Sequence, residues 1–147
     1  MLNKLPNYYT FFIGGLLNGF SFFSSILIPL SILGHYLLIK GLFCKVRNFN
    51  PILSGWLFGV GFFLTSMHWI VNPFLIYEEH KILAPSVLIV FPSLMGLFFT
   101  VPCVLIKKFI NFQKINDLFF TKILLISFFI FISEFLRSNI FGGLPFN

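Results

Sequence analysis

The sequence predicts an all-α membrane protein, in which residues 1–147 form one transmembrane domain, a helical bundle of about five transmembrane helices. Of the 147 residues, 58% are hydrophobic and only 10% are charged, whereas a typical soluble chain carries roughly 25% charged residues. The mean hydropathy of +0.97 is typical of helices in a bilayer, where backbone polar groups must be bonded within the segment itself.

The net charge of +6 does not indicate a nucleic-acid partner. The basic residues lie mostly between apolar segments, where the positive-inside rule places them in a membrane protein. We therefore expect a multi-pass protein whose partner is the membrane, with no binding to nucleic acid.

The first apolar segment, Phe11 to Ile39, contains no Asp, Glu, Lys or Arg. Its 29 residues would form a helix about 43 Å long, well beyond a hydrocarbon core of roughly 30 Å. The segment is either one steeply tilted helix or two short crossings broken around Ser21 to Ser25. We favour two crossings, because they place Lys4 on the same side of the membrane as Lys40. No small-x-small cleavage site follows, so we expect an uncleaved helix.

Three further crossings follow in the sequence. Ile52 to Val71 is predicted to form one crossing that ends at Asn72-Pro73. Ile82 to Ile106 is predicted to form the next, and its prolines are expected to kink or cap it. Leu118 to Leu136 is predicted to form the last crossing. The prolines of the fourth crossing are Pro85, Pro92 and Pro102.

The loops between these segments alternate in charge. Cys44 to Asn50 and Lys107 to Lys114 are basic, whereas Asn72 to Lys81 carries Glu78 and Glu79. The positive-inside rule then predicts a cytoplasmic N-terminus and an exterior Glu78-Glu79 loop. Five crossings place the end of the chain on the outside.

Two charged residues, Glu134 and Arg137, close the last apolar run. They are three residues apart, so on a helix they share a face and can pair. The structural interpretation is an ion pair that neutralises itself at the interface, with Arg137 snorkelling outward. The functional interpretation is a polar anchor that shapes a lipid-headgroup or substrate entrance. The sequence alone favours the structural interpretation, because such pairs are often structural.

Two small-residue motifs predict close contacts between membrane helices. They are Gly15-x-x-x-Gly19 and Gly55-x-x-x-Gly59, and this spacing lets two helix backbones approach each other.

Several polar residues interrupt the apolar runs. Asn18 and His35 are expected to bond to neighbouring helices. His68 and Trp69 lie at the outer end of the third crossing, where a tryptophan is typical of the interfacial belt and a histidine is expected to be hydrogen-bonded.

No set of residues in this sequence can be assembled into an active site. There is no metal-ligand spacing, no Gly-rich phosphate loop and no nucleophile with a credible base. Cys44 lies in a basic loop and Cys103 lies inside an apolar segment, so we expect neither a disulfide nor an activated thiol. We therefore expect no catalytic residue, no metal ion and no cofactor in this chain.

Two stretches of the chain match the motifs of one family. The run from Gly55 to Leu64, G-W-L-F-G-V-G-F-F-L, continues to H-W-I at His68 to Ile70; it resembles G-x-L-x-G-x-G-x-F followed by Y/N-W-I/V. The end of the chain, E-F-L-R from Glu134 and then G-L-P-F-N from Gly143, resembles E-W/F-L-R followed by G-F/L-P-W. Both patterns belong to the N-terminal membrane part of bacterial apolipoprotein N-acyltransferases. The resemblance covers essentially the whole chain, with Phe146 where the family usually has tryptophan.

This resemblance implies a role in lipoprotein maturation at the bacterial cytoplasmic (inner) membrane. The family takes an acyl chain from a phospholipid onto a cysteine as a thioester and passes it to the α-amino group of the diacylglyceryl-cysteine that begins an apolipoprotein. The glutamate base, the lysine and that cysteine lie in an outer, nitrilase-like domain. None of the three is in this chain. The implied partners are thus phospholipid and lipoprotein substrates and a nitrilase-like domain that is missing or on a separate chain.

The resemblance also implies roles for five residues as lipid-entrance or structural positions. Glu134 and Arg137 would hold the end of the last helix. Pro145 and Phe146 would begin the loop beneath the active site, and Trp69 would lie near the same side. The membrane base would position the catalytic domain and admit lipid from the side.

Two hypotheses follow. The first is an N-terminal part of an N-acyltransferase, inactive alone, whose end at Asn147 inside the second motif reflects an incomplete sequence, a split gene or decay. The alternative is a small non-catalytic polytopic membrane protein, a transporter half or assembly partner, with Asn18, His35 and His68 lining a path. The alternative leaves both family-like motifs unexplained.

Overall fold

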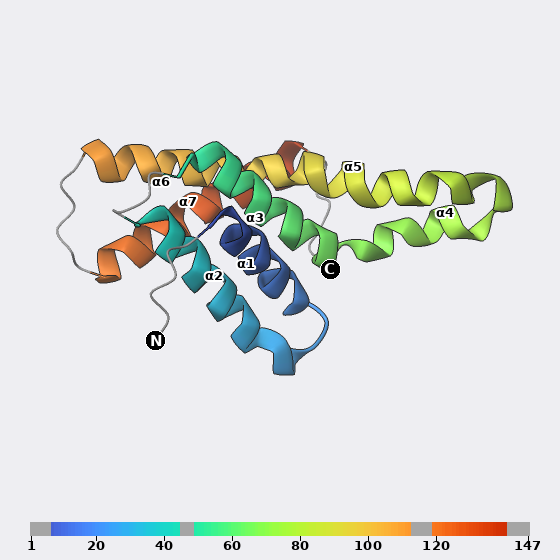
Figure 1. The fold of residues 1–147 in the computed structure, drawn as a ribbon, viewed down its shortest axis with the longest axis horizontal. Helices are drawn as coiled ribbons and strands as arrows, with labels where there is room; N and C mark the ends of the chain where they lie inside the picture. The colour runs from blue at the N-terminus through green and yellow to red at the C-terminus, as the bar shows by residue number, and fades with distance from the viewer. Residues whose placement is uncertain (1–6, 45–48, 113–118, 141–147) are drawn as a thin grey trace.

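The computed structural model describes residues 7–44, 49–112 and 119–140, and every element in these ranges is a helix (Figure 1). The predicted all-α membrane fold is confirmed. The α-helices are α1 (Tyr8–Phe20), α2 (Ile28–Leu42), α3 (Pro51–Ser66), α4 (Asn72–Ile76), α5 (Ala84–Gly96), α6 (Thr100–Phe112) and α7 (Phe119–Ile140). Short 3-10 helices join them: η1 (Ser25–Leu27), η2 (His68–Val71), η3 (Glu78–Leu83) and η4 (Leu97–Phe99).

The first apolar segment is broken where the sequence predicted. α1 ends at Phe20, and Ser24 then caps η1 by accepting a hydrogen bond from the Ile26 N–H at 3.4 Å. Pro29 lies in the first turn of α2, a position that suits its fixed φ and missing N–H. The two helices run side by side in opposite directions, as Figure 1 shows.

α3 lies at the centre of the bundle and packs against α1, α5 and α6. Its phenylalanines Phe58, Phe62 and Phe63 are buried. Their ring centroids lie 5.3, 5.5 and 6.0 Å from that of Phe99 in η4, and such tilted or edge-on aromatic contacts are favourable. This aromatic cluster joins the α1–α2 hairpin to the second half of the chain.

Both predicted glycine motifs lie in close helix contacts, as expected. Gly15 and Gly19 of α1 lie against α3, while Gly55 and Gly59 of α3 lie against η4 and α5. A Cβ atom on Gly59 would lie 2.6 Å from both the Cα and the carbonyl oxygen of Gly96. No side chain fits in that space, so glycine permits this contact.

The third predicted crossing ends earlier than the sequence suggested. α3 stops at Ser66, the chain turns at Met67, and η2 with α4 continues at 65° to α3. Asn72-Pro73 therefore begins a helix instead of ending one, because proline is well suited to a first helical turn. The predicted exterior loop is helical as well, since it forms α4 and η3.

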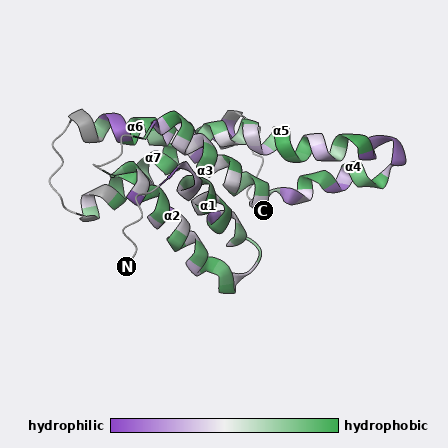
Figure 2. Ribbon diagram, viewed as in Figure 1, coloured by the Kyte–Doolittle hydropathy of each residue, from purple (hydrophilic) through white to green (hydrophobic). Residues whose placement is uncertain are grey.

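The fourth predicted crossing belongs to a longer helical rod, Glu78–Phe109, of 32 residues. At 1.5 Å per residue it is about 48 Å long, more than the hydrocarbon core of a bilayer. Pro85 lies in the first turn of α5 and Pro92 inside it, and η4 separates α5 from α6. The outer part of the rod pairs with α4 as an arm that projects from the bundle (Figure 1), with hydrophilic residues at its tip (Figure 2).

The last predicted crossing forms α7 and extends four residues past Leu136, to Ile140; Leu118 lies outside the described residues. α7 packs against α6 and η4. The Ser133 hydroxyl donates a hydrogen bond to the Phe98 carbonyl oxygen at 2.7 Å, which fixes α7 to the rod.

The number of crossings stays a prediction. Within the described ranges, Ser25–Leu42 and Glu78–Phe109 are long and apolar enough to span a membrane, and the bent pair of α3 with η2 and α4 would be a third span. α1 has 13 residues, about 20 Å of helix.

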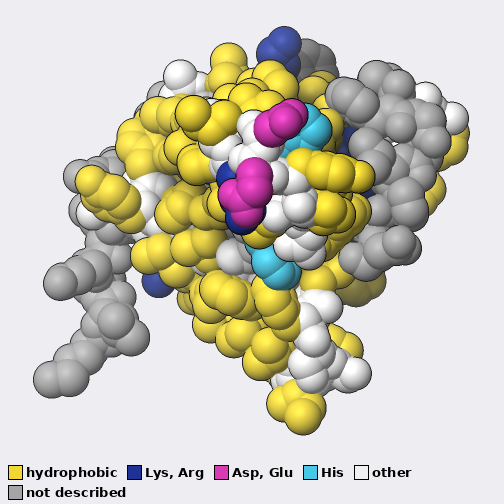
Figure 3. Space-filling view, turned by 90° about the vertical axis from the view of Figure 1, so that its right-hand side faces the viewer, with side chains coloured by type: hydrophobic (Ala, Val, Ile, Leu, Met, Phe, Trp, Pro, Cys, Tyr) yellow, Lys and Arg dark blue, Asp and Glu magenta, His cyan; other side chains and the backbone are white. Residues whose placement is uncertain are grey.

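Charged side chains gather at opposite ends of the molecule. Lys40, Lys107 and Lys108 lie near the ends of α2 and α6, where Lys107 Nζ lies 3.4 Å from the Leu42 carbonyl oxygen. The acidic side chains of η3 lie at the tip of the arm, amid a largely hydrophobic surface (Figure 3). The positive-inside rule predicts a cytoplasmic basic end and an exterior arm, and this orientation stays a prediction.

Candidate functional site

A cavity of about 430 Å³ lies between the α1–α2 hairpin, α3, η4 and α7, and we call it the α2–α7 cavity. Its volume is within the range of roughly 300–1,000 Å³ that is typical of small-molecule sites. Its polar lining residues are Asn18, Ser21, Ser31, His35 and Glu134. The other lining residues are apolar, so the cavity has the mixed character of a binding site.

The α7 side of the cavity is built on the Glu134–Arg137 pair. Arg137 donates hydrogen bonds from Nε and Nη2 to Glu134 Oε2, at 3.0 and 2.9 Å. The predicted pairing on one helix face is therefore confirmed.

The predicted outward snorkelling of Arg137 is wrong. Its side chain is only 2% exposed, and Cζ lies 5.8 Å from the centroid of the Phe63 ring. The aromatic face and the carboxylate give the guanidinium favourable contacts inside the bundle, so it does not have to reach the interface.

Glu134 presents a hydrogen-bond acceptor to the cavity. Both bonds from Arg137 go to Oε2, and Oε1 accepts none from the part of the chain that the structure describes. The Glu134 side chain is 24% exposed, so a ligand in the cavity can reach it. The pair as a whole is neutral, and the site it offers suits a polar donor on an otherwise apolar molecule.

The α1–α2 side of the cavity is a second polar cluster. Ser31 Oγ donates to Asn18 Oδ1 at 2.6 Å, which confirms the predicted bond between Asn18 and a neighbouring helix. His35 differs from the prediction, because its Nδ1 lies 2.9 Å from the carbonyl oxygen of Ser31 in the same helix. A carbonyl oxygen only accepts, so Nδ1 carries the proton in this contact.

The cavity opens toward the turn between α1 and α2. Two of its apolar lining residues, Phe22 and Ile28, are 48% and 55% exposed. α2 packs mainly against α1, whereas α7 packs against α6 and η4. The two walls of the cavity are thus held by different neighbours.

The other predicted site residues lie elsewhere. Trp69 is in η2, is 39% exposed and does not line the α2–α7 cavity. His68 stacks on Phe23, with ring centroids 4.9 Å apart, and does not line the cavity that Asn18 and His35 share. Pro145 and Phe146 lie outside the described residues, and the roles of Trp69 and of these two stay predictions.

Neither cysteine belongs to the cavity. Cys103 is buried in the hydrophobic core, Cys44 follows α2 at the basic end, and both are free.

Sequence reasoning missed Ser21 and Ser31 as site residues. Ser31 lies four residues before His35, which places both on one face of α2. That spacing was the available signal for Ser31. Its hydrogen-bond partner Asn18 is on α1 and could be placed beside it only once the hairpin was known.

The family model of the apolipoprotein N-acyltransferase N-terminal domain matches residues 10–147. The chain belongs to the apolipoprotein N-acyltransferase family. The match contains both motif stretches, and it includes every residue that lines the α2–α7 cavity. No curated protein and no solved structure matches the chain. The cavity thus lies within the part of the chain that matches the N-terminal domain of the family.

Proposed function

We propose that this chain is the membrane part of an apolipoprotein N-acyltransferase and that a phospholipid enters the α2–α7 cavity from the bilayer. The observation that carries the proposal is the cavity itself, which opens toward the turn between α1 and α2 and has Glu134 in its wall. Its apolar walls suit an acyl chain, and Glu134 Oε1 suits a hydrogen-bond donor on the lipid headgroup.

The place of the cavity along the bundle supports this proposal. Apart from Phe62 of α3 and Phe99 of η4, its residues come from the end of α1 and the turn after it, the first half of α2 and the second half of α7. With the basic end in the cytoplasm, these are the outer halves of the three helices. The resemblance to the family implies a nitrilase-like catalytic domain on that same side, and such a domain would meet a lipid held in this cavity.

The chain's own residues would bind and orient lipid, and the acyl transfer would take place in the catalytic domain. We infer that the five positions predicted from the resemblance serve this membrane base: Glu134 with Arg137 at the cavity, and Trp69, Pro145 and Phe146 toward the outer side. The implied substrates are phospholipid and lipoprotein, and the implied location is the bacterial cytoplasmic membrane.

We expect the purified polypeptide alone to transfer no acyl group from phospholipid to a diacylglyceryl lipopeptide. Cys103 is 1% exposed in the core, and Cys44 lies at the basic end, away from the α2–α7 cavity, so neither thiol can attack a lipid held there. Mass spectrometry of the lipopeptide measures the transfer. Turnover above that of a Cys44→Ser/Cys103→Ser variant would contradict this expectation.

Filling the cavity is expected to exclude lipid from it. The chain is reconstituted in nanodiscs with a phospholipid whose acyl chain carries a photoreactive group, and the label on the peptides that contain Ile28 and Ile130 is quantified. Ser31→Trp fills the cavity and should reduce this label several-fold.

The matched control is Ile32→Trp, at the adjacent position. Ile32 is 70% exposed and does not line the cavity, so the added ring should leave the label unchanged. Equal labelling of both variants and the wild type would show that lipid does not enter the cavity.

A further inference from the structure

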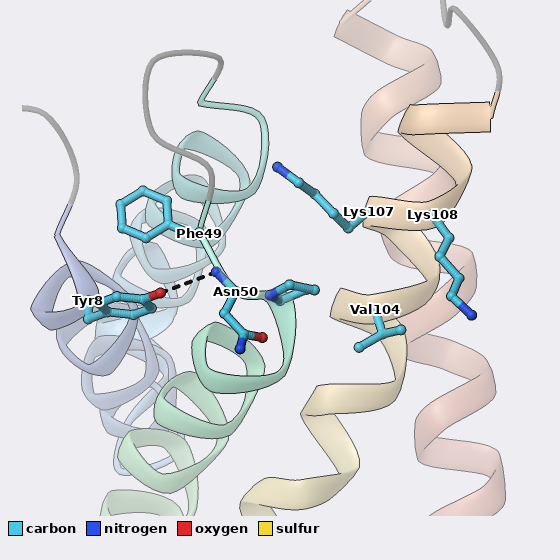
Figure 4. A pocket seen from close by; sticks show the side chains of 7 residues that line it. Tyr8, Phe49, Asn50, Val104, Lys107 and Lys108 are labelled. Carbon is cyan, nitrogen blue, oxygen red and sulfur yellow. Dashed lines mark hydrogen bonds between the residues drawn. The ribbon is translucent and has the colours of Figure 1, made fainter.

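A second pocket lies at the basic end of the bundle, between the beginning of α3 and the end of α6 (Figure 4). Its volume is about 490 Å³. Tyr8, Asn50, Val104, Lys107 and Lys108 are among its lining residues. It shares no lining residue with the α2–α7 cavity and lies at the opposite ends of α1 and α3.

The pocket carries two positive charges. The Lys107 side chain extends across the space between α6 and α3 (Figure 4). Its hydrogen bond to the Leu42 carbonyl oxygen, at 3.4 Å, uses one ammonium proton and leaves others to donate. Lys108 is exposed and forms no ion pair with any residue that the structure describes. No acidic side chain is among the described residues that line the pocket.

Neutral groups complete the pocket. The backbone N–H of Asn50 donates to the Tyr8 hydroxyl oxygen at 3.2 Å, which leaves the hydroxyl proton free to be donated. Asn50 Oδ1 is itself occupied, because it accepts from the Ile52 N–H at 3.0 Å and caps α3. Val104 gives an apolar wall next to the lysines on α6. Charged donors, a hydroxyl donor and an apolar wall thus surround one space.

We propose that this pocket binds the phosphate group of an anionic phospholipid in the cytoplasmic leaflet. The charge of the pocket and its place at the basic end fit that leaflet, where basic pockets between transmembrane helices bind anionic headgroups. The apolar wall distinguishes a lipid, whose glycerol and acyl groups would contact Val104, from a free phosphate ion. This site lies at the opposite end of the bundle from the proposed lipid entrance and does not depend on it.

The test measures lipid binding to the purified full chain in detergent by native mass spectrometry. We expect phosphatidylglycerol to bind at least tenfold more tightly than phosphatidylcholine. Lys107→Gln and Lys108→Gln should each weaken the binding of phosphatidylglycerol about fivefold, and the double variant should weaken it about thirtyfold.

The control for the change in net charge is Lys40→Gln. Lys40 lies at the same basic end but outside the pocket, with Nζ 5.8 Å from the Tyr36 ring, so its loss should leave the affinity within twofold of wild type. Val104→Trp keeps both lysines and occupies the pocket, and it should also weaken binding. This variant gives a second test if the lysine variants do not fold.

Three results would overturn the proposal. Lysine and Val104 variants that bind phosphatidylglycerol as the wild type does would exclude the pocket as the site. Equal binding of phosphatidylcholine would exclude recognition of an anionic headgroup. Displacement of the lipid by millimolar inorganic phosphate would show a site for free phosphate instead.

Discussion

Glu134→Ala is expected to destabilise the protein by about 3 kcal/mol, the lower end of the effect of breaking a buried ion pair. Arg137 is 2% exposed and gives two hydrogen bonds to Glu134 Oε2. Without the carboxylate, the buried guanidinium loses the acceptor of both bonds and a neutralising charge, and burying such a charge is costly. The partial exposure of Glu134 limits the effect.

Unfolding of the purified chain in mixed detergent micelles measures this change. The double variant Glu134→Gln/Arg137→Met should recover most of the lost stability, because it removes the buried charge together with its partner. Glu79→Ala is the control, since Glu79 is exposed in η3 and its loss should have no measurable effect. A Glu134→Ala variant as stable as wild type would show that the pair is dispensable.

Gly59→Leu is expected to destabilise the bundle by about 3 kcal/mol or more, because larger side chains in a packed contact displace the backbone. A Cβ at this position would lie 2.6 Å from Gly96 Cα and its carbonyl oxygen. These are backbone atoms, which cannot make room by a change of rotamer as a flexible side chain can. α3 and α5 would have to separate, and the aromatic cluster between α3 and η4 would open with them.

The yield of monodisperse protein and its thermal stability in detergent measure the effect of Gly59→Leu. Ser86→Leu adds similar bulk to α5 at an exposed position and should behave as the wild type does. If Gly59→Leu folds with unchanged stability, the close approach of α3 and α5 is not required for folding.

Local patterns predicted the features that depend on neighbouring residues. The break after Phe20, the glycine contacts of α3 and the pairing of Glu134 with Arg137 all follow from helical spacing or from small and polar residues in a short window. These features needed no knowledge of how the helices are arranged.

Features set by distant contacts could not be predicted in this way. Arg137 is buried because Phe63, more than 70 residues earlier in the chain, lies under its guanidinium. The bend at Met67 carries no proline or glycine to mark it, and the Asn72-Pro73 pair that looked like a helix end begins α4. The α2–α7 cavity joins residues from α1, α2, α3, η4 and α7, so its existence depends on the whole bundle.

The central claim is that phospholipid enters the α2–α7 cavity. It is tested most directly with a cross-linking group on the protein instead of on the lipid. A photoreactive amino acid at Ile130, which lines the cavity, is cross-linked in nanodiscs, and the adduct is identified by mass spectrometry. We predict a phospholipid adduct in the wild-type background and with Ile32→Trp, and its loss with Ser31→Trp. An adduct that persists with Ser31→Trp, or no phospholipid adduct at Ile130 in the wild-type background, would contradict the claim.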